Sequence, residues 1–73
     1  MINTLNINTP YIKLEQFLKL IDLVSSGGEA KLYLEDNYVL INEEKDNRRG
    51  RKLYPGDLIE IDGEKYQICM LER

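Results

Sequence analysis

Near Asn37, the spacing of the apolar residues changes from that of a helix to that of strands. Before that point, the apolar residues Leu14, Phe17, Leu18 and Ile21 recur at i, i+3, i+4 and i+7, which is one face of an α-helix. After it, apolar and polar residues alternate with a period of two, which is typical of half-buried strands. The change of period predicts helices followed by strands, and therefore an α+β fold.

Two helices are expected in the first half of the chain. The first covers about residues 13–24, and the segment Ser25-Ser26-Gly27-Gly28 interrupts its pattern. The second covers about residues 27–37. Ser26 and Glu29 have the spacing of a capping box, in which each side chain satisfies a free backbone N–H group of the first turn.

Short strands are expected where apolar and polar residues alternate, at residues 5–7, 39–41, 59–61 and 66–70. Tyr54-Pro55-Gly56-Asp57 fits a type II turn, and Asp62-Gly63 is a strong signal for a two-residue hairpin. The sequence therefore predicts two helices packed on one side of a small, mostly antiparallel sheet.

Length and residue usage exclude several classes of function. A chain of 73 residues with 42% hydrophobic residues allows one small domain, expected over residues 1–73, with no room for a deep cleft. The chain has no histidine and one cysteine, Cys69, which excludes histidine chemistry, an internal disulfide and a multi-cysteine zinc site. Four acidic residues near the last hairpin lie in a segment expected to be solvated. We therefore expect no enzyme, no metal and no cofactor.

The sequence also bears on location. Its first residues lack the basic and apolar regions of a signal peptide, and charged residues interrupt its longest apolar stretch. A lone reduced cysteine is typical of the cytosol. We therefore expect a cytoplasmic protein.

Charge is unevenly distributed. The formal net charge is −3, but residues 45–52 contain five cationic residues and one acid, Asp46, and so carry +4 against −7 for the remainder. Because salt screens each charge within roughly 8 Å, a ligand senses this segment more than the total. The alternative is a solvated loop without a ligand.

Two motifs are suited to phosphate. Ser26-Gly27-Gly28 opens a helix, where backbone N–H groups lack partners, and Lys31 lies one turn further on. Three arginines and a lysine surround Gly50, and the guanidinium fork matches two phosphate oxygens. The alternative for the first motif is an ordinary turn between two helices.

Four blocks occur in the order and spacing of the S-four RNA-binding domain, which the chain resembles over about residues 11–61. They are Lys13-Leu14-Glu15-Gln16-Phe17-Leu18, Ser26-Gly27-Gly28-Glu29-Ala30-Lys31, Val39-Leu40-Ile41-Asn42 and Pro55-Gly56-Asp57. The two glycines and residues 48–57 are similar to the small stand-alone YaaA-like branch of that family.

The resemblance implies an αL RNA-binding motif, in which two helices and the following loop grip structured RNA. It also implies a non-catalytic protein whose partners are ribosomal RNA, or transfer RNA, and the large ribosomal subunit, with a role in ribosome assembly or association. We expect no DNA or membrane partner. Carried over by position, the RNA-binding candidates are Lys13, Gln16, Ser26, Gly27, Gly28, Lys31, Arg48, Arg49, Arg51 and Lys52.

The chain departs from the family pattern in three places. Lys13-Leu14-Glu15 replaces the usual Arg-Leu-Asp, Gly27 replaces the arginine that usually follows the serine, and Glu43 replaces a glycine after Asn42.

The aromatic residues leave a further alternative open. Tyr11, Tyr33 and Tyr38 can stack on unpaired bases, but we expect them in the core with a solvated hydroxyl.

A second hypothesis is a protein–protein adaptor. In it, the basic loop meets an acidic protein, and the hairpin edge around Tyr66 and Ile68 extends the partner's sheet.

The RNA hypothesis has two geometric requirements. The start of the second helix and the arginine loop must face the same way, and the arginines must not be neutralised by the chain's own carboxylates.

Overall fold

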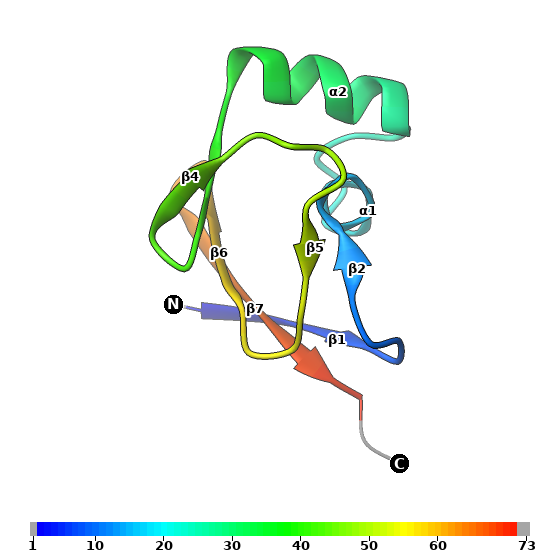
Figure 1. Ribbon diagram of the computed structural model, residues 1–73, viewed down its shortest axis with the longest axis vertical. Helices are drawn as coiled ribbons and strands as arrows, with labels where there is room; N and C mark the ends of the chain where they lie inside the picture. The colour runs from blue at the N-terminus through cyan, green and yellow to red at the C-terminus, as the bar shows by residue number, and fades with distance from the viewer. Residues whose placement is uncertain (1, 72–73) are drawn as a thin grey trace.

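A computed structural model describes residues 2–71. It contains two helices and a mostly antiparallel sheet, which confirms the expected α+β fold (Figure 1). The elements in chain order are β1 (Ile2–Ile7), β2 (Ile12–Lys13), α1 (Leu14–Leu20), α2 (Gly27–Asp36), β3 (Val39–Ile41), β4 (Glu44–Asp46), β5 (Lys52–Leu53), β6 (Leu58–Ile61) and β7 (Glu64–Met70).

The strands form two separate sheets. The larger has five strands in the order β1-β7-β6-β3-β4, antiparallel except for the parallel pair β1–β7. The smaller is the two-stranded antiparallel ribbon β2–β5, in which Ile12 faces Leu53 and Lys13 faces Lys52. Figure 1 shows this ribbon beside α1, with α2 at the top of the molecule. Sequence periodicity did not predict β2 or β5, because each is only two residues long.

The core lies between α1 and the larger sheet. Leu14, Phe17 and Leu18 are fully buried, as their helical spacing predicted. The Phe17 ring meets the Tyr66 ring of β7 edge-on, with centroids 5.4 Å apart. Leu53 of the ribbon is also fully buried, so the ribbon packs on the same core. This packing fixes α1 between the sheet and the ribbon.

Helix α1 ends at Leu20, earlier than the expected end near residue 24. Asp22 adopts a left-handed conformation, with φ 63°. The Asp22 amide donates to the Lys19 carbonyl at 3.0 Å, and the Leu23 amide donates to the Leu18 carbonyl at 3.1 Å. This hydrogen-bond pattern is a Schellman motif, which usually has glycine at the left-handed position. Asp22 occupies that position here, so the sequence lacks the usual stop signal.

Helix α2 and the two predicted turns agree with the sequence analysis. Helix α2 ends at Asp36, one residue before the expected end. Gly56 has φ 98°, and the Asp57 amide donates to the Tyr54 carbonyl at 2.9 Å, as a type II turn requires. Asp62 and Gly63 both have positive φ, as in a type I′ hairpin.

The adaptor hypothesis is wrong in expecting a free strand edge at Tyr66 and Ile68. Tyr66 and Ile68 lie on β7, which pairs with β6 on one side and with β1 on the other. The backbone of β7 therefore has no free edge along these residues. In the described part of the chain, the edge strands of the larger sheet are β1 and β4.

Strands β3 and β4 form a hairpin that the sequence analysis did not predict. Its two turn residues are Asn42, with φ 52°, and Glu43, with φ 73°. Hairpin turns with two positive φ angles favour glycine at the second position. Glu43 occupies that position, at the site where the family pattern has glycine, and this substitution concealed the turn.

Replacing Glu43 with glycine is expected to raise the free energy of unfolding by about 1 kcal/mol, because a left-handed conformation is strained in any residue with a Cβ. Urea denaturation followed by circular dichroism measures the change. The matched control is Glu44→Gly in strand β4, where the added backbone freedom should lower stability by about 0.5–1 kcal/mol. Equal effects of the two substitutions would contradict the assignment of strain to Glu43.

Candidate nucleic-acid interface

The arginine-rich loop, residues 47–51, is hydrogen-bonded to the start of helix α1. The Arg51 carbonyl accepts from the Leu14 amide at 2.7 Å, and the Arg49 carbonyl accepts from the Glu15 amide at 3.0 Å. Lys13, the N-cap of α1, makes no capping bond with its side chain. Because the first amides of a helix have no partner within the helix, the loop supplies acceptors that α1 would otherwise lack. These two bonds place the loop beside α1.

The start of helix α2 is capped by its own residues. Ser26 Oγ accepts from the Glu29 amide at 3.2 Å, as the capping-box spacing predicted. Glu29 Oε1 accepts from the Ser25 amide at 2.7 Å, one residue before the expected donor. Gly28 faces open space, whereas a Cβ at Gly27 would lie 3.2 Å from Glu15 Oε2. The Glu15 carboxylate therefore lies beside Gly27, one of the residues predicted to bind a phosphate.

The structure brings the arginine loop and the start of α2 together, as the RNA hypothesis requires. Arg49 Nη1 donates to the Gly27 carbonyl at 3.5 Å. A shallow hollow of about 220 Å³ separates α2 from the loop, and it is lined by Lys31, Leu34, Glu35, Asn47 and Arg49. Lys31 of α2 and Arg49 of the loop thus share one concave surface.

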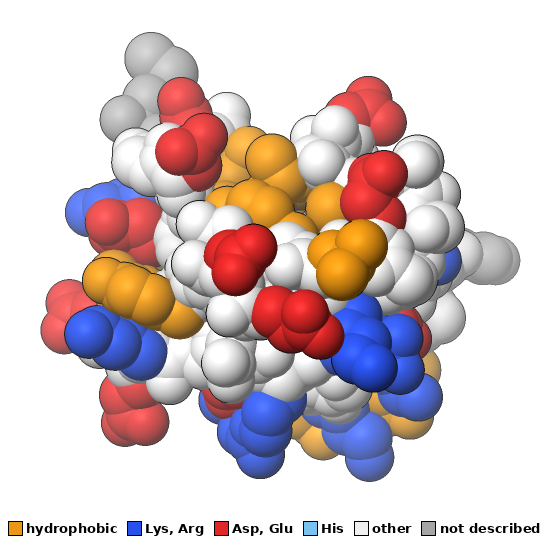
Figure 2. Space-filling view, turned by 90° about the horizontal axis from the view of Figure 1, so that it is seen from above, with side chains coloured by type: hydrophobic (Ala, Val, Ile, Leu, Met, Phe, Trp, Pro, Cys, Tyr) orange, Lys and Arg blue, Asp and Glu red, His pale blue; other side chains and the backbone are white. Residues whose placement is uncertain are grey.

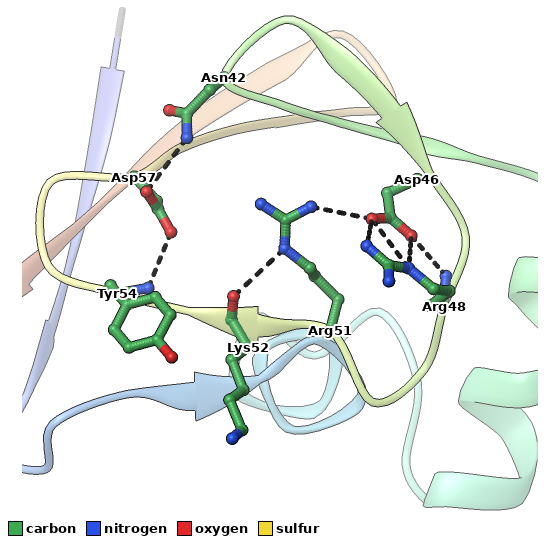
Figure 3. A network of polar contacts seen from close by, with 7 residues as sticks. All are labelled: Asn42, Asp46, Arg48, Arg51, Lys52, Tyr54 and Asp57. Carbon is green, nitrogen blue, oxygen red and sulfur yellow. Dashed lines mark hydrogen bonds and ion pairs between the residues drawn. The ribbon is translucent and has the colours of Figure 1, made fainter.

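Asp46 holds two of the arginines. Its carboxylate accepts from Arg48 Nη2 at 2.8 Å and from Arg51 Nη1 at 2.9 Å, and it also accepts from the Arg48 amide at 2.8 Å (Figure 3). The Asp46 side chain is 8% exposed, whereas that of Arg48 is 70% exposed. The side-chain hydrogen bond from Arg48 is the main cause that holds the pKa of Asp46 well below its usual range. Asp46 is therefore an internal anchor from which the Arg48 guanidinium projects into solvent.

The third arginine is also paired. Arg49 Nε lies 3.3 Å from Glu15 Oε2 of α1. The expectation of arginines free of internal carboxylates is therefore wrong. Three guanidinium groups share only two carboxylates, so a positive surplus remains in this network.

The lysines near this network add to the surplus. Within residues 2–71, no carboxylate lies within ion-pair distance of Lys13, Lys31, Lys45 or Lys52. Figure 2 views the molecule from the α2 end and shows most Lys and Arg side chains along one border of that face, with acidic side chains over its middle. We call the surface formed by the ten candidate residues the basic face; Gln16, its uncharged member on α1, is exposed.

Three polar residues have roles that the sequence patterns did not indicate. By its pattern, Asp46 was only the one acid in a basic segment. Asp57 accepts from the Tyr54 amide at 2.8 Å and from Asn42 Nδ2 at 3.1 Å (Figure 3). Asn42 Oδ1 accepts from the Leu58 amide at 3.0 Å. These bonds tie the turn at residues 54–57 to the β3–β4 hairpin. The carboxylate of Asp57, three residues after Tyr54, was the available signal for such a turn.

The tyrosines divide between core and surface. Tyr33 packs half-buried against the core, and burial raises its pKa, so the core expectation is confirmed for this residue. Tyr38 is 53% exposed, with Lys45 Nζ 4.6 Å from its ring centroid, so the same expectation is wrong there. Tyr11 is half-buried, and its ring lies 5.8 Å from that of Tyr54.

The described residues contain neither a metal-binding cluster nor a membrane-spanning helix. No group of three or more cysteine, aspartate or glutamate side chains within residues 2–71 is arranged to hold a metal ion. In the same range, neither helix is long and apolar enough to cross a bilayer.

Two short helices with a basic loop hydrogen-bonded to both, carried by a mostly antiparallel sheet, define a small α+β domain with a cationic surface. Sequence comparison identifies the family. The family model described as S4 domain matches residues 5–69, so this chain belongs to the S4 domain family, and the S-four resemblance is confirmed. A curated relative, the "Probable ribosome maturation protein RlbA" of Bacillus subtilis (strain 168), is 57% identical over 63 residues. The alignment covers 86% of this chain and 89% of that relative.

Replacing Asp46 with asparagine is expected to lower the free energy of unfolding at pH 7, because two guanidinium groups lose their anionic partner. The pKa of Asp46 is lower in the folded than in the unfolded chain. Its stabilisation is therefore complete above the ordinary value of 3.8 and declines as the pH falls below it. The difference between wild type and variant should thus be smaller at acidic pH than at neutral pH.

Urea denaturation at pH 7 and at a pH about one unit below the ordinary aspartate pKa measures both differences. The matched control is Glu44→Gln, which removes an exposed carboxylate from the same strand. Its effect should be small at both values. An equal loss for Asp46→Asn at the two pH values would contradict the ion-pair explanation.

Proposed function

We propose that this protein is a non-catalytic RNA-binding protein that recognises structured ribosomal RNA and acts in the assembly of the large ribosomal subunit. Membership of the S4 domain family supports RNA binding. The name of the Bacillus subtilis relative supports a role in ribosome maturation. The observation that carries the proposal is the docking of the arginine loop against the starts of α1 and α2, which gathers cations from three chain segments.

Internal pairing is compatible with phosphate binding. A guanidinium group has five N–H donors, and Arg48 directs Nε and Nη2 to Asp46 while its side chain stays 70% exposed. Arg48 Nη1 donates no hydrogen bond within residues 2–71 and is available to a ligand, while Asp46 fixes the position of the guanidinium group. Fixing an arginine before binding reduces the conformational entropy that the complex must lose. In this proposal, Asp46 and Glu15 position the arginines, and the surplus charge attracts the RNA.

The ten candidate residues have distinct proposed roles. Lys31 and Arg49 neutralise phosphates at the hollow between α2 and the loop, and Arg48, Arg51 and Lys52 neutralise neighbouring phosphates. Ser26, Gly27 and Gly28 offer backbone amides to one phosphate at the start of α2, where Gly28 faces open space. Lys13 and Gln16 contact the RNA at the margin. The acidic remainder of the chain repels RNA and confines the complex to the basic face.

Sucrose-gradient sedimentation of a cell extract tests the ribosomal role. The protein is expected to co-migrate with the large subunit or its precursors and to lose this co-migration after ribonuclease treatment. Co-migration that survives ribonuclease would favour protein–protein association instead. Co-migration with the small subunit alone would contradict the assignment to the large subunit.

The double substitution Arg48→Gln and Arg49→Gln is expected to weaken binding to deproteinised large-subunit ribosomal RNA by about 10-fold or more near physiological salt. If four to six phosphates are engaged, the wild-type slope of log affinity against log salt is about −3 to −5. The variant should lose about 1.4 to 1.8 of that slope, because two phosphate contacts disappear. Filter binding over about 50 to 200 mM salt measures both quantities.

The control for this experiment is the double substitution Lys19→Gln and Lys65→Gln. It removes the same charge from α1 and β7, outside the basic face. Circular dichroism confirms that both variants are folded. Equal losses of affinity in the two variants would show that total charge, rather than the basic face, controls binding.

A further inference from the structure

The β2–β5 ribbon carries two kinds of side chain on its two faces. Ile12 and Leu53 face each other and are buried, with Leu53 completely inaccessible. Neighbouring residues of a strand point to opposite faces, so the residues on either side of this pair point away from the core. Within the ribbon these are Lys13 and Lys52. Tyr11 directly precedes β2 and Tyr54 directly follows β5, and the contacts of Tyr11 with Lys52 and with Tyr54 place both rings on the same face. The outer face of the ribbon is thus formed by two lysines and two tyrosines.

The two lysines of this face are directly opposite each other. Lys13 pairs with Lys52 in the register of the ribbon, and both are exposed. Like charges at directly opposed positions destabilise a strand pair. Within residues 2–71, no carboxylate forms an ion pair with either lysine. Local conflicts of this kind in natural proteins are concentrated at functional sites.

The two tyrosines continue the same face. Their ring centroids are 5.8 Å apart at an angle of 50°, and Lys52 Nζ lies 4.9 Å from the centroid of Tyr11. Tyr11 is half-buried, so its ring is held between Lys52 and Tyr54, whereas Tyr54 is 48% exposed. Figure 3 shows the side chains of Lys52 and Tyr54 pointing away from Arg51 and Asp46. The ring of Tyr54 is therefore a supported, solvent-facing platform beside two cations.

We propose that the outer face of the β2–β5 ribbon binds one unpaired nucleotide of the RNA, with the base stacked on Tyr54 and a phosphate between Lys13 and Lys52. This inference rests on the proposed RNA-binding function and extends it, because the basic face by itself contacts phosphates only. Aromatic rings beside cations bind single-stranded nucleotides, since every base has a π-face and every nucleotide has a phosphate. Paired bases of an A-form helix are not accessible to such a ring.

The ribbon shares Lys13 and Lys52 with the basic face and lies directly beside the arginine loop. Arg51 directly precedes β5, and its carbonyl accepts from the first amide of α1, which directly follows β2. One RNA can therefore place phosphates along the arginine loop and an extruded nucleotide on the ribbon. The nearest acid of the turn, Asp57, is occupied with the Tyr54 amide and with Asn42. Replacing the Tyr54 side chain leaves these backbone contacts in place.

The test compares two RNA probes, a hairpin with a single-stranded loop and a blunt duplex of the same stem sequence. Tyr54→Leu is expected to weaken binding to the hairpin by about 10-fold, because stacking on one aromatic ring is lost. Its binding to the duplex should be unchanged. The slope of log affinity against log salt should also be unchanged, because stacking neutralises no phosphate. Lys52→Gln should instead reduce that slope by about 0.7.

Two controls separate stacking from other roles of Tyr54. Tyr54→Phe keeps the ring and should bind the hairpin as the wild type does, whereas a hydrogen bond from the hydroxyl would make this variant weak. Tyr38→Leu removes a tyrosine of similar exposure, 53%, that also has a lysine near its ring but lies between α2 and β3. It should bind both probes normally. Ultraviolet crosslinking to the hairpin should modify the tryptic peptide 53–65, in which Tyr54 is the one tyrosine.

The outcomes distinguish this inference from the function on which it rests. Equal losses on hairpin and duplex, or an unaffected Tyr54→Leu variant, would overturn the nucleotide site while leaving the basic face intact. Tighter binding to polyglutamate than to either RNA would assign the ribbon to protein carboxylates instead. A wild-type protein without salt-dependent affinity for either RNA would overturn both proposals.

Discussion

Two backbone hydrogen bonds determine the shape of the basic face. The Arg49 and Arg51 carbonyls accept from the first two amides of α1, so the arginine loop completes a helix start that has no side-chain cap. The same contact brings β5 alongside β2 and allows Arg49 to reach the Gly27 carbonyl of α2. Because these bonds use backbone atoms, they fix where the loop lies whichever side chains it carries. The cations are then free to act on a ligand.

Sequence patterns predicted two kinds of structure correctly: helices and strands with a regular spacing of apolar residues, and turns that contain glycine. Leu14, Phe17 and Leu18 were correctly assigned to a buried helix face, and the turns at Gly56 and Gly63 formed as expected. Two predictions failed where an acidic residue occupies a left-handed position that usually holds glycine. Asp22 ends α1, and Glu43 closes the β3–β4 hairpin, at positions where glycine would have signalled the end.

The sequence indicated which residues belong to the candidate site, but it did not indicate how their side chains pair with one another. Clustered arginines and the Ser26–Gly28 start suggested phosphate contacts, and the family resemblance placed them in one motif. The pairing of Asp46 with two arginines, and of Glu15 with Arg49, depends on tertiary contacts that no local pattern contains. The lysine and tyrosine pairs of the ribbon have the same origin, because the register that opposes Lys13 and Lys52 joins segments about forty residues apart.

The parallel pair β1–β7 affects how the chain can fold. Residues 2–7 pair with residues 65–70, so β1 stays without its partner until β7, about sixty residues further along the chain, has been synthesised. Contacts between such distant segments close large loops, which slows their formation relative to local turns. During synthesis, the helices and the β3–β4 hairpin can therefore form while β1 is still without its partner. The sheet becomes complete only after β7 has been synthesised.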